Sequence, residues 1–275
     1  MLTLVPTPIG NLDDISSRVL QALRSAELFL CEDTRVTKKL LSLLSEKYNT
    51  SFPCSSFQSF HHHNDQKLLA TFDVTTFKEK NIVYVSDAGM PCISDPGATL
   101  VDFCIQHGIN YDVLPGPNAV LTAYAMSGFN YTTFTFFGFL PHKGKERAIE
   151  LAKVLNSEII PILYESPHRL LKLLEELNHC DENRVVFLAK ELTKKYQTTF
   201  KATAKELYEH FKKENIKGEW VVVIEPIKAA VGENITLTDI QELDLPPKQK
   251  AKLLSKMTGR AVKEIYQELL DTIHS

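Results

Sequence analysis

Short apolar runs alternate with stretches of helical periodicity from the first residues of the chain. Residues 2–5 read as a strand, and Ile15, Val19 and Leu23 follow at helical spacing. Further apolar runs predict strands at residues 27–31, 82–85 and 111–114, and then at residues 134–139, 159–164, 185–189 and 220–224. Strands that alternate with helices are typical of α/β proteins, so the pattern predicts two αβα domains with a mostly parallel sheet in each.

Proline and glycine mark the division between these domains. The segment "LPGPNA" at residues 114–119 forms a Pro-Gly-Pro turn before an apolar helix that starts at Ala119. We therefore expect an N-terminal α/β domain at residues 1–116 and a C-terminal α/β domain at residues 117–226.

The character of the chain changes after Pro226. Residues 228–245 carry four acids against one base and no long apolar run, which predicts an acidic linker at residues 227–245. Residues 246–263 then carry six bases and no acid. Two amphipathic helices around a turn at residues 258–260 would make residues 246–275 a small, basic helix-turn-helix-like appendage.

Composition narrows the class of protein. The chain has 275 residues, 44% of them hydrophobic, and a formal net charge of −3, which excludes a uniformly basic nucleic-acid coat but not a local basic patch. Its five cysteines include no C-x-x-C pair, which is typical of reduced thiols. With neither a signal-peptide pattern nor an apolar stretch of about 20 residues, we expect a soluble cytoplasmic protein.

The segment "VSDAGMPCISDPGATLV" at residues 85–101 contains the first candidate chemistry. Asp95 before Pro96 is typical of a helix start. Asp87, in contrast, follows a strand at the edge where open α/β sheets bind ligands, and Gly89 allows close approach to the backbone. Because no lysine accompanies them, this strand end suits a ligand with hydroxyl or ammonium groups and a positive centre, such as S-adenosylmethionine.

Several common sites are not supported by the sequence. It contains neither a phosphate-binding G-x-x-x-x-G-K-[ST] loop nor the G-x-G-x-x-G, H-E-x-x-H and G-x-S-x-G motifs. The run "FHHHN" at residues 60–64 invites a metal interpretation, but adjacent histidines cannot all face one ion. We expect no metal site.

Three more polar clusters follow predicted strands. They are "CEDTR" at residues 31–35, "YESPHR" at 164–169 and "AKELTKK" at 189–195. Singly, each could consist of helix caps and surface ion pairs. Together with the end of the strand at residues 82–85, they indicate one shared cleft.

These motifs carry a resemblance to a known family. In order, "TPIGNLDDIS", "CEDTRVTKKLL", "SDAGMPCISDPG", "LPGPNA", "GFLP", "YESPHRL", "AKELTK" and "GEWVVVIE" resemble the tetrapyrrole-methylase superfamily, most closely its ribosomal RNA small subunit methyltransferase I group. The resemblance covers residues 1 to about 226, and the basic tail is similar to the C-terminal extension of that group.

The resemblance implies a two-domain α/β enzyme that binds S-adenosylmethionine in the trough between its domains, commonly as a homodimer. The methyl group would pass to the ribose 2′-hydroxyl of a cytidine in the decoding region of 16S rRNA within the small ribosomal subunit. Transferred by motif, the cofactor-binding residues would be Pro8, Asp87, Gly89, Ile93, Ser94, Asn118, Ala119, Tyr164, Ala189 and Gly218.

Loss of the hydroxyl proton needs a general base or stabilisation of the oxyanion. The candidates at the strand ends are Asp33, Arg35, His61, Asn64, Glu191 and Lys194. We expect Asp33 to orient or accept and Arg35 to hold a phosphate or the oxyanion, although the two could instead form an ion pair that braces a loop.

Candidate RNA contacts lie in the tail: Lys248, Lys250, Lys252, Lys256, Arg260 and Lys263. Alternatively, these helices pack on the core or on a dimer interface. Two other functions remain open: methylation of a tetrapyrrole or a protein by another superfamily member, and a non-catalytic RNA-binding factor. Loss of the cofactor cleft would favour the non-catalytic factor, whereas the basic tail disfavours methylation of a tetrapyrrole or a protein.

Overall fold

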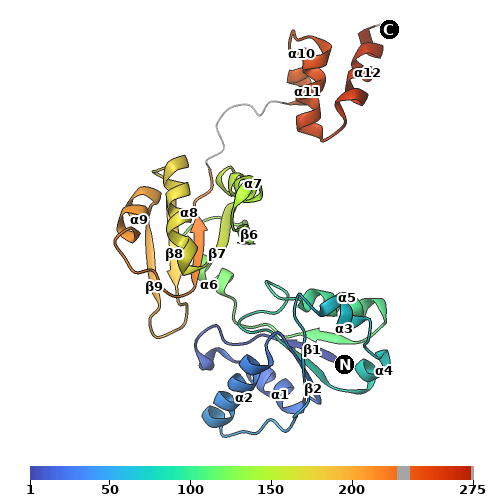
Figure 1. Ribbon diagram of the computed structural model, residues 1–275, viewed down its shortest axis with the longest axis vertical. Helices are drawn as coiled ribbons and strands as arrows, with labels where there is room; N and C mark the ends of the chain where they lie inside the picture. The colour runs from blue at the N-terminus through green and yellow to red at the C-terminus, as the bar shows by residue number, and fades with distance from the viewer. Residues whose placement is uncertain (228–235, 274–275) are drawn as a thin grey trace. The chain divides into compact units, whose positions relative to one another are not determined.

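The computed structural model describes residues 1–227 and 236–273 of the chain. The chain divides into two compact units, Met1–Ile227 and Lys228–Ser275. The larger unit contains two five-stranded sheets with helices between the strands (Figure 1). The expected α/β fold with two domains is confirmed.

The first sheet is parallel throughout, with the strand order β3-β2-β4-β1-β5. Its strands are β1 (Leu2–Val5), β2 (Leu28–Cys31), β3 (Phe57–Ser59), β4 (Ile82–Val85) and β5 (Tyr111–Val113). Its helices are α1 (Ser17–Ser25), α2 (Thr34–Tyr48), α3 (Asp65–Leu69), α4 (Val74–Glu79) and α5 (Gly97–Gln106).

Strand β4 is central and buried on both faces. Val83 and Val85 pack in a cluster with residues of α1 and α2, whereas Ile82 and Tyr84 pack with residues of α5. A strand that is covered on both faces needs no polar alternation, which explains its unbroken apolar run. Because Cys31 of β2 is in register with Val85, both strands end at the same level.

The second sheet has the order β6-β7-β10-β8-β9. Its strands are β6 (Phe134–Phe139), β7 (Ile160–Glu165), β8 (Val185–Lys190), β9 (Thr198–Thr203) and β10 (Trp220–Ile224). Its helices are α6 (Ala119–Ser127), α7 (Gly144–Leu155), α8 (Pro167–Cys180) and α9 (Ala204–Phe211). Helices α7, α8 and α9 contribute side chains to one apolar cluster of this sheet, and α6 contributes to the other.

A mostly parallel second sheet was expected, but this sheet is mixed. Only β6 and β7 pair in parallel; β10 runs antiparallel to both β7 and β8, and β9 antiparallel to β8. The connection at residues 191–197 is too short for a crossover, so β8 and β9 must form a hairpin. After α9, the chain re-enters in the direction of β9 and inserts β10 between β7 and β8.

The smaller unit consists, in the residues described, of α10 (Leu237–Glu242), α11 (Pro247–Thr258) and α12 (Val262–Ile273). Ile240, Ala251, Leu254 and Ile265 form its core. The acidic linker expected at residues 227–245 thus contains a helix, because Thr236 and Asp239 form a capping box and Ile240 has an apolar partner surface. Residues 228–235 of that linker lie outside the described residues.

Candidate active site

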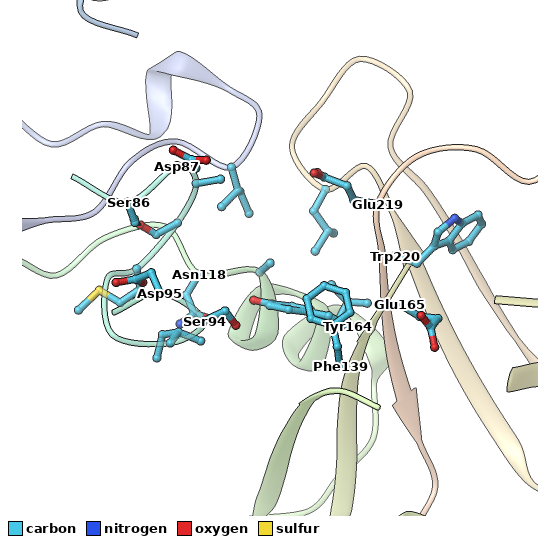
Figure 2. Close-up of a pocket in the computed structure, with 18 of the residues that line it drawn as sticks. Ser86, Asp87, Ser94, Asp95, Asn118, Phe139, Tyr164, Glu165, Glu219 and Trp220 are labelled. Carbon is cyan, nitrogen blue, oxygen red and sulfur yellow. The ribbon is translucent and has the colours of Figure 1, made fainter. Parts of the chain in front are cut away.

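A cavity of about 440 Å³ lies in the larger unit and is lined by residues at or next to the ends of strands of both sheets. Figure 2 shows Ser86, Asp87 and Asn118 on one side of it and Tyr164 and Glu219 on the other. The carboxyl ends of strands are where open α/β sheets bind ligands, so this cavity is the candidate active site.

The segment after β4 is fixed to the segment after β1. The backbones of Thr7 and Gly89 exchange two hydrogen bonds of 3.0 and 3.1 Å, and the Gly89 amide also reaches the Thr7 hydroxyl at 3.1 Å. Gly89 has a φ of +87°, and a Cβ atom there would lie 3.2 Å from a methyl group of Ile9. Only glycine fits this conformation without strain, and the cavity wall depends on it.

Replacement of Gly89 by alanine should therefore lower the free energy of unfolding by about 1–3 kcal/mol. Gly108→Ala is the matched control, because Gly108 also has a positive φ, +59°, but open space around a new Cβ atom. Urea denaturation of both variants measures the difference. Equal losses would show that the contact with Ile9 is relaxed at no cost.

Carboxylates dominate the polar lining, which contains five of them and, among the described residues, no lysine, arginine or histidine. The five are Glu32, Asp87, Asp95, Glu165 and Glu219. Three already have strong partners: Asp95 accepts a 2.8 Å hydrogen bond from the Tyr84 hydroxyl, Glu165 pairs with Arg169 at 3.1 Å, and Glu219 pairs with Lys194 at 2.7 Å.

Glu32 and Asp87 form no ion pair within the described part of the chain. Glu32 follows β2 and accepts the Asp87 amide at 3.2 Å, while Asp87 follows β4 and accepts the Asp33 amide at 3.0 Å. Burial, and then the nearby negative charges, raise the pKa of both carboxyl groups above their ordinary values. This side of the cavity thus favours a ligand that brings positive charge or hydroxyl donors.

The opposite side is largely apolar and aromatic. The rings of Phe139 and Tyr164 lie with their centroids 5.5 Å apart, and Leu192 and Val221 add aliphatic surface. Burial raises the pKa of the Tyr164 hydroxyl to about 12, so it stays protonated at neutral pH. A ligand that fits here combines a flat apolar part with a polar, cationic part.

Comparison with known proteins agrees with this geometry. Residues 1–208 match the family model described as tetrapyrrole (corrin/porphyrin) methylases. A protein of Campylobacter fetus named ribosomal RNA small subunit methyltransferase I is 50% identical over 98% of this chain and 100% of its own length. One of the same name from Helicobacter pylori is 46% identical over 98% of each chain.

The chain belongs to this family of methyltransferases. A solved structure of uroporphyrin-III C-methyl transferase from Thermus thermophilus, complexed with S-adenyl homocysteine, has the same fold. Its TM-score is 0.54 at 15% identity, and the match covers 81% of this chain and 96% of that one. The family resemblance read from the motifs is thus confirmed.

Eight of the ten residues expected to bind the cofactor line the cavity of this methyltransferase. They are Asp87, Gly89, Ile93, Ser94, Asn118, Ala119, Tyr164 and Ala189. Pro8 and Gly218 do not line it, although each precedes a residue that does, Ile9 and Glu219. Gly218 packs against the side chain of Glu191: a Cβ atom added at Gly218 would lie 2.7 Å from the Cγ atom of Glu191.

None of the six candidate catalytic residues lines the cavity, and each has a local partner. Asp33 caps α2, and its carboxylate binds the Arg35 guanidinium at 2.6 Å, which lowers the pKa of Asp33 to about 2. The side-chain oxygen Oδ1 of Asn64 accepts a hydrogen bond of 2.9 Å from the backbone N–H of His61. The last two candidates, Glu191 and Lys194, form an ion pair with each other at 3.1 Å.

The structure brings other residues to the cavity that sequence reasoning missed, above all Glu32, Phe139 and Trp220. Glu32 is the first acid of "CEDTR", directly after β2, so its position was a usable signal. Phe139 and Trp220 lie within strands, where an aromatic residue is indistinguishable from core.

The helix start in "ISDPG" also differs from expectation. Pro96 is the N-cap and α5 begins at Gly97, because the Asp95 carboxylate accepts both the Gly97 amide and the Tyr84 hydroxyl at 2.8 Å.

The six basic residues of the tail lie in the smaller unit, on α11, on α12 and between them. Lys248, Lys252, Lys256 and Lys263 are exposed, whereas Lys250 is half-buried. Arg260 is also exposed and forms an ion pair with Glu268, with one nitrogen–oxygen distance of 3.1 Å.

The described residues contain no group of three or more His, Cys, Asp or Glu side chains that could hold a metal ion. Among the helices of residues 1–227 and 236–273, none is both long and apolar enough to cross a membrane.

Proposed function

We propose that this protein transfers a methyl group from S-adenosylmethionine to the ribose 2′-hydroxyl of a cytidine in the decoding region of 16S rRNA. The observation that carries the proposal is the cavity between the strand ends, with unpaired carboxylates on one side and aromatic rings on the other. The family, and relatives named for small-subunit ribosomal RNA, support the substrate class.

The donor set of the cavity fits S-adenosylmethionine. Its lining offers carboxylates to an ammonium group, a positive sulfur and ribose hydroxyls, and an aromatic wall to a flat base. A phosphate-bearing cofactor would instead meet only negative charge. Bound there, S-adenosylmethionine would supply a methyl carbon already activated by positive sulfur.

The residues of the chain then have three tasks. Asp87 and its neighbours after β4 would hold the cationic and hydroxyl-bearing part of the cofactor. Phe139 and Tyr164 would seat its flat part and exclude water. Asp33, tied to Arg35, would orient the end of β2, and Arg35, whose side chain is 89% exposed, would contact an RNA phosphate. Alignment of oxygen, methyl carbon and sulfur supplies much of the rate.

Purified protein incubated with radiolabelled S-adenosylmethionine and unmethylated small subunits tests this function. We expect label on one cytidine ribose of 16S rRNA, located by nuclease mapping. Label on a base or on a protein, or none on RNA at all, would contradict the proposal. A parallel incubation with free 16S rRNA in place of the subunits shows which of the two forms accepts the methyl group.

A homodimer is part of the proposal, supported by the apolar surface around β6. This strand lies at the sheet edge, and its Phe134 is 37% exposed. On the neighbouring α6, Leu121 is 52% and Met126 41% exposed. The rings of Tyr124 and Phe134 lie 5.2 Å apart, so this part of α6 packs beside β6, with Leu121 one helical turn before Tyr124. Exposed edge strands with apolar side chains are rarely left uncovered.

Phe134→Asp should therefore shift the protein from dimer to monomer, because a carboxylate would be buried without a partner. Analytical ultracentrifugation measures the change. Tyr111→Asp, at a 40% exposed aromatic residue on β5, is the control and should leave the dimer intact. A wild-type monomer at micromolar concentration would refute this part of the proposal.

A further inference from the structure

The aromatic wall of the cavity includes Phe139, a residue with little burial of its own. Phe139 is the last residue of β6, a strand at the sheet edge, and it is 55% exposed. Figure 2 shows its ring beside that of Tyr164, and the two ring centroids lie 5.5 Å apart. Because a ring this exposed gains little from burial, its direction is set by the backbone that carries it.

A β-bulge turns Phe139 toward the cavity. Phe136 is in register with Ile162 and Phe139 with Tyr164, so β6 takes three steps where β7 takes two, and Gly138 within this irregularity has a φ of +64°. Side chains three residues apart point to opposite faces of a regular strand. Here the rings of Phe136 and Phe139 both pack on Tyr164, at 4.8 and 5.5 Å between centroids. The extra residue thus redirects Phe139, as bulges beside active sites do.

Two arginines hold the backbone directly after Phe139. The Arg169 guanidinium, from α8, donates a hydrogen bond of 2.5 Å to the carbonyl oxygen of Leu140. The Arg147 guanidinium, from α7, donates one of 3.0 Å to the carbonyl oxygen of Pro141. The side chain of Leu140 also packs in the core, but apolar packing is not directional. Hydrogen bonds to successive carbonyls are directional, and they fix the rotation of these peptide units.

Both guanidinium groups are themselves fixed by carboxylates. Arg147 is buried and pairs with Glu176 at 2.6 Å, and Arg169 is half-buried and pairs with Glu165 at 3.1 Å. The Glu165 side chain is only 1% exposed, so its charge depends on this partner. Although Glu165 lines the cavity, its carboxylate is thus engaged in holding Arg169.

We propose that Arg169 is a positioning residue of the cofactor site: it fixes the segment after β6 and thereby holds Phe139 against the flat part of S-adenosylmethionine. This role rests on the cofactor binding proposed above. Glu165 fixes the guanidinium of Arg169, and Arg147 fixes the next carbonyl along the chain. Phe139 lines the cavity but Arg169 does not, so Arg169 acts on the cofactor through Phe139.

Arg169→Lys tests this role, because lysine keeps a positive charge beside Glu165 but lacks the planar group that binds two partners at once. We expect the dissociation constant of S-adenosylmethionine, measured by calorimetry, to rise about 3- to 10-fold, and about 10-fold in Phe139→Ala. The double variant should bind about as weakly as Phe139→Ala, because without the ring the arginine has nothing to position.

Arg184→Lys is the matched control. Arg184 also binds two backbone carbonyls of the same domain, those of Leu155 at 3.3 Å and Glu225 at 3.2 Å, and it pairs with Asp181 at 2.8 Å. None of these four residues lines the cavity. Urea denaturation should therefore show a loss of stability in Arg184→Lys as in Arg169→Lys, whereas the cofactor affinity of Arg184→Lys should equal wild type.

Wild-type affinity in Arg169→Lys or in Phe139→Ala would overturn the proposal. So would losses that multiply in the double variant, because Arg169 would then act on the cofactor by a route other than Phe139. Weaker binding in Arg184→Lys would also overturn it, since general loosening of the domain would explain the effect. If the wild-type protein binds no S-adenosylmethionine at all, the proposed function itself is rejected.

Discussion

Replacement of Asp87 by asparagine is expected to weaken the binding of S-adenosylmethionine by about 1–3 kcal/mol, roughly 5- to 150-fold. Asp87 lines the cavity, has no cationic partner among the described residues, and accepts a single backbone amide at 3.0 Å. The variant keeps an oxygen for that amide but loses the charge that would attract an ammonium group or a positive sulfur. Calorimetry without added metal measures the loss.

The same binding should depend on pH in a defined direction. Burial raises the pKa of Asp87 above 3.8, and burial likewise raises that of Glu32 above 4.5. As the pH falls through these raised values, the carboxylates take up protons and the affinity for a cation should fall. The decrease should therefore begin at a higher pH than for solvated carboxylates, and it should be smaller in Asp87→Asn.

Asp102→Asn is the control for Asp87→Asn. Asp102 lies on α5, where its carboxylate accepts the Gln106 side chain at 2.7 Å in an exposed position, and it does not line the cavity. The control should bind the cofactor as tightly as wild type. If Asp87→Asn also binds at wild-type affinity, Asp87 contributes no charge to the site.

Four of the five strands of the first sheet could be predicted from sequence, because burial on both faces leaves a plain signal, whereas the three-residue edge strand β3 was missed. Strand β4 is an uninterrupted apolar run, and the helices of this domain show apolar residues at helical spacing. The alternation of such strands and helices along the chain predicts a parallel sheet. In the second domain the apolar runs predicted where most strands lie, but not whether neighbouring strands pair in parallel or antiparallel. The run "TTFKAT" of β9 has few large apolar residues, so the hairpin that makes that sheet mixed was missed.

The candidate site could be predicted where a motif coincides with a strand end. Asp87, Asn118 and Tyr164 follow or end predicted strands, and all three line the cavity. The sequence could not show which of two adjacent acids in one motif lines the cavity, because "CEDTR" places Glu32 and Asp33 one residue apart. Side-chain direction separates them: Glu32 points into the cavity, whereas Asp33 caps α2 and binds Arg35.

The smaller unit is expected to supply much of the affinity for rRNA, although the whole chain has a net charge of −3. Phosphate contacts by lysines release counterions from the RNA, so binding weakens steeply with salt. Lys248, Lys252 and Lys256 all lie exposed on α11. Their joint replacement by glutamine should weaken binding to small subunits and reduce the log–log salt slope by about 0.7–0.9 for each phosphate that is no longer neutralised.

Three lysines of the larger unit provide a control with the same change in net charge. Lys67, Lys78 and Lys80 are exposed on or beside α3 and α4, and their replacement by glutamine also takes the formal charge from −3 to −6. If α11 binds phosphates directly, only the α11 variant should show a flatter slope, whereas a general field effect would weaken both variants alike.

Deletion of residues 228–275 should have the larger effect on RNA and none on the cofactor, since every residue that lines the cavity precedes residue 222. The core of the smaller unit is formed by its own residues, among them Ile240, Leu254 and Ile265, so its removal leaves the clusters of the larger unit complete. A salt titration of subunit binding compares the full-length and shortened proteins, with calorimetry to confirm cofactor affinity. Identical slopes and affinities would mean that the lysines of α11 are merely solvated and that RNA is bound by the larger unit alone.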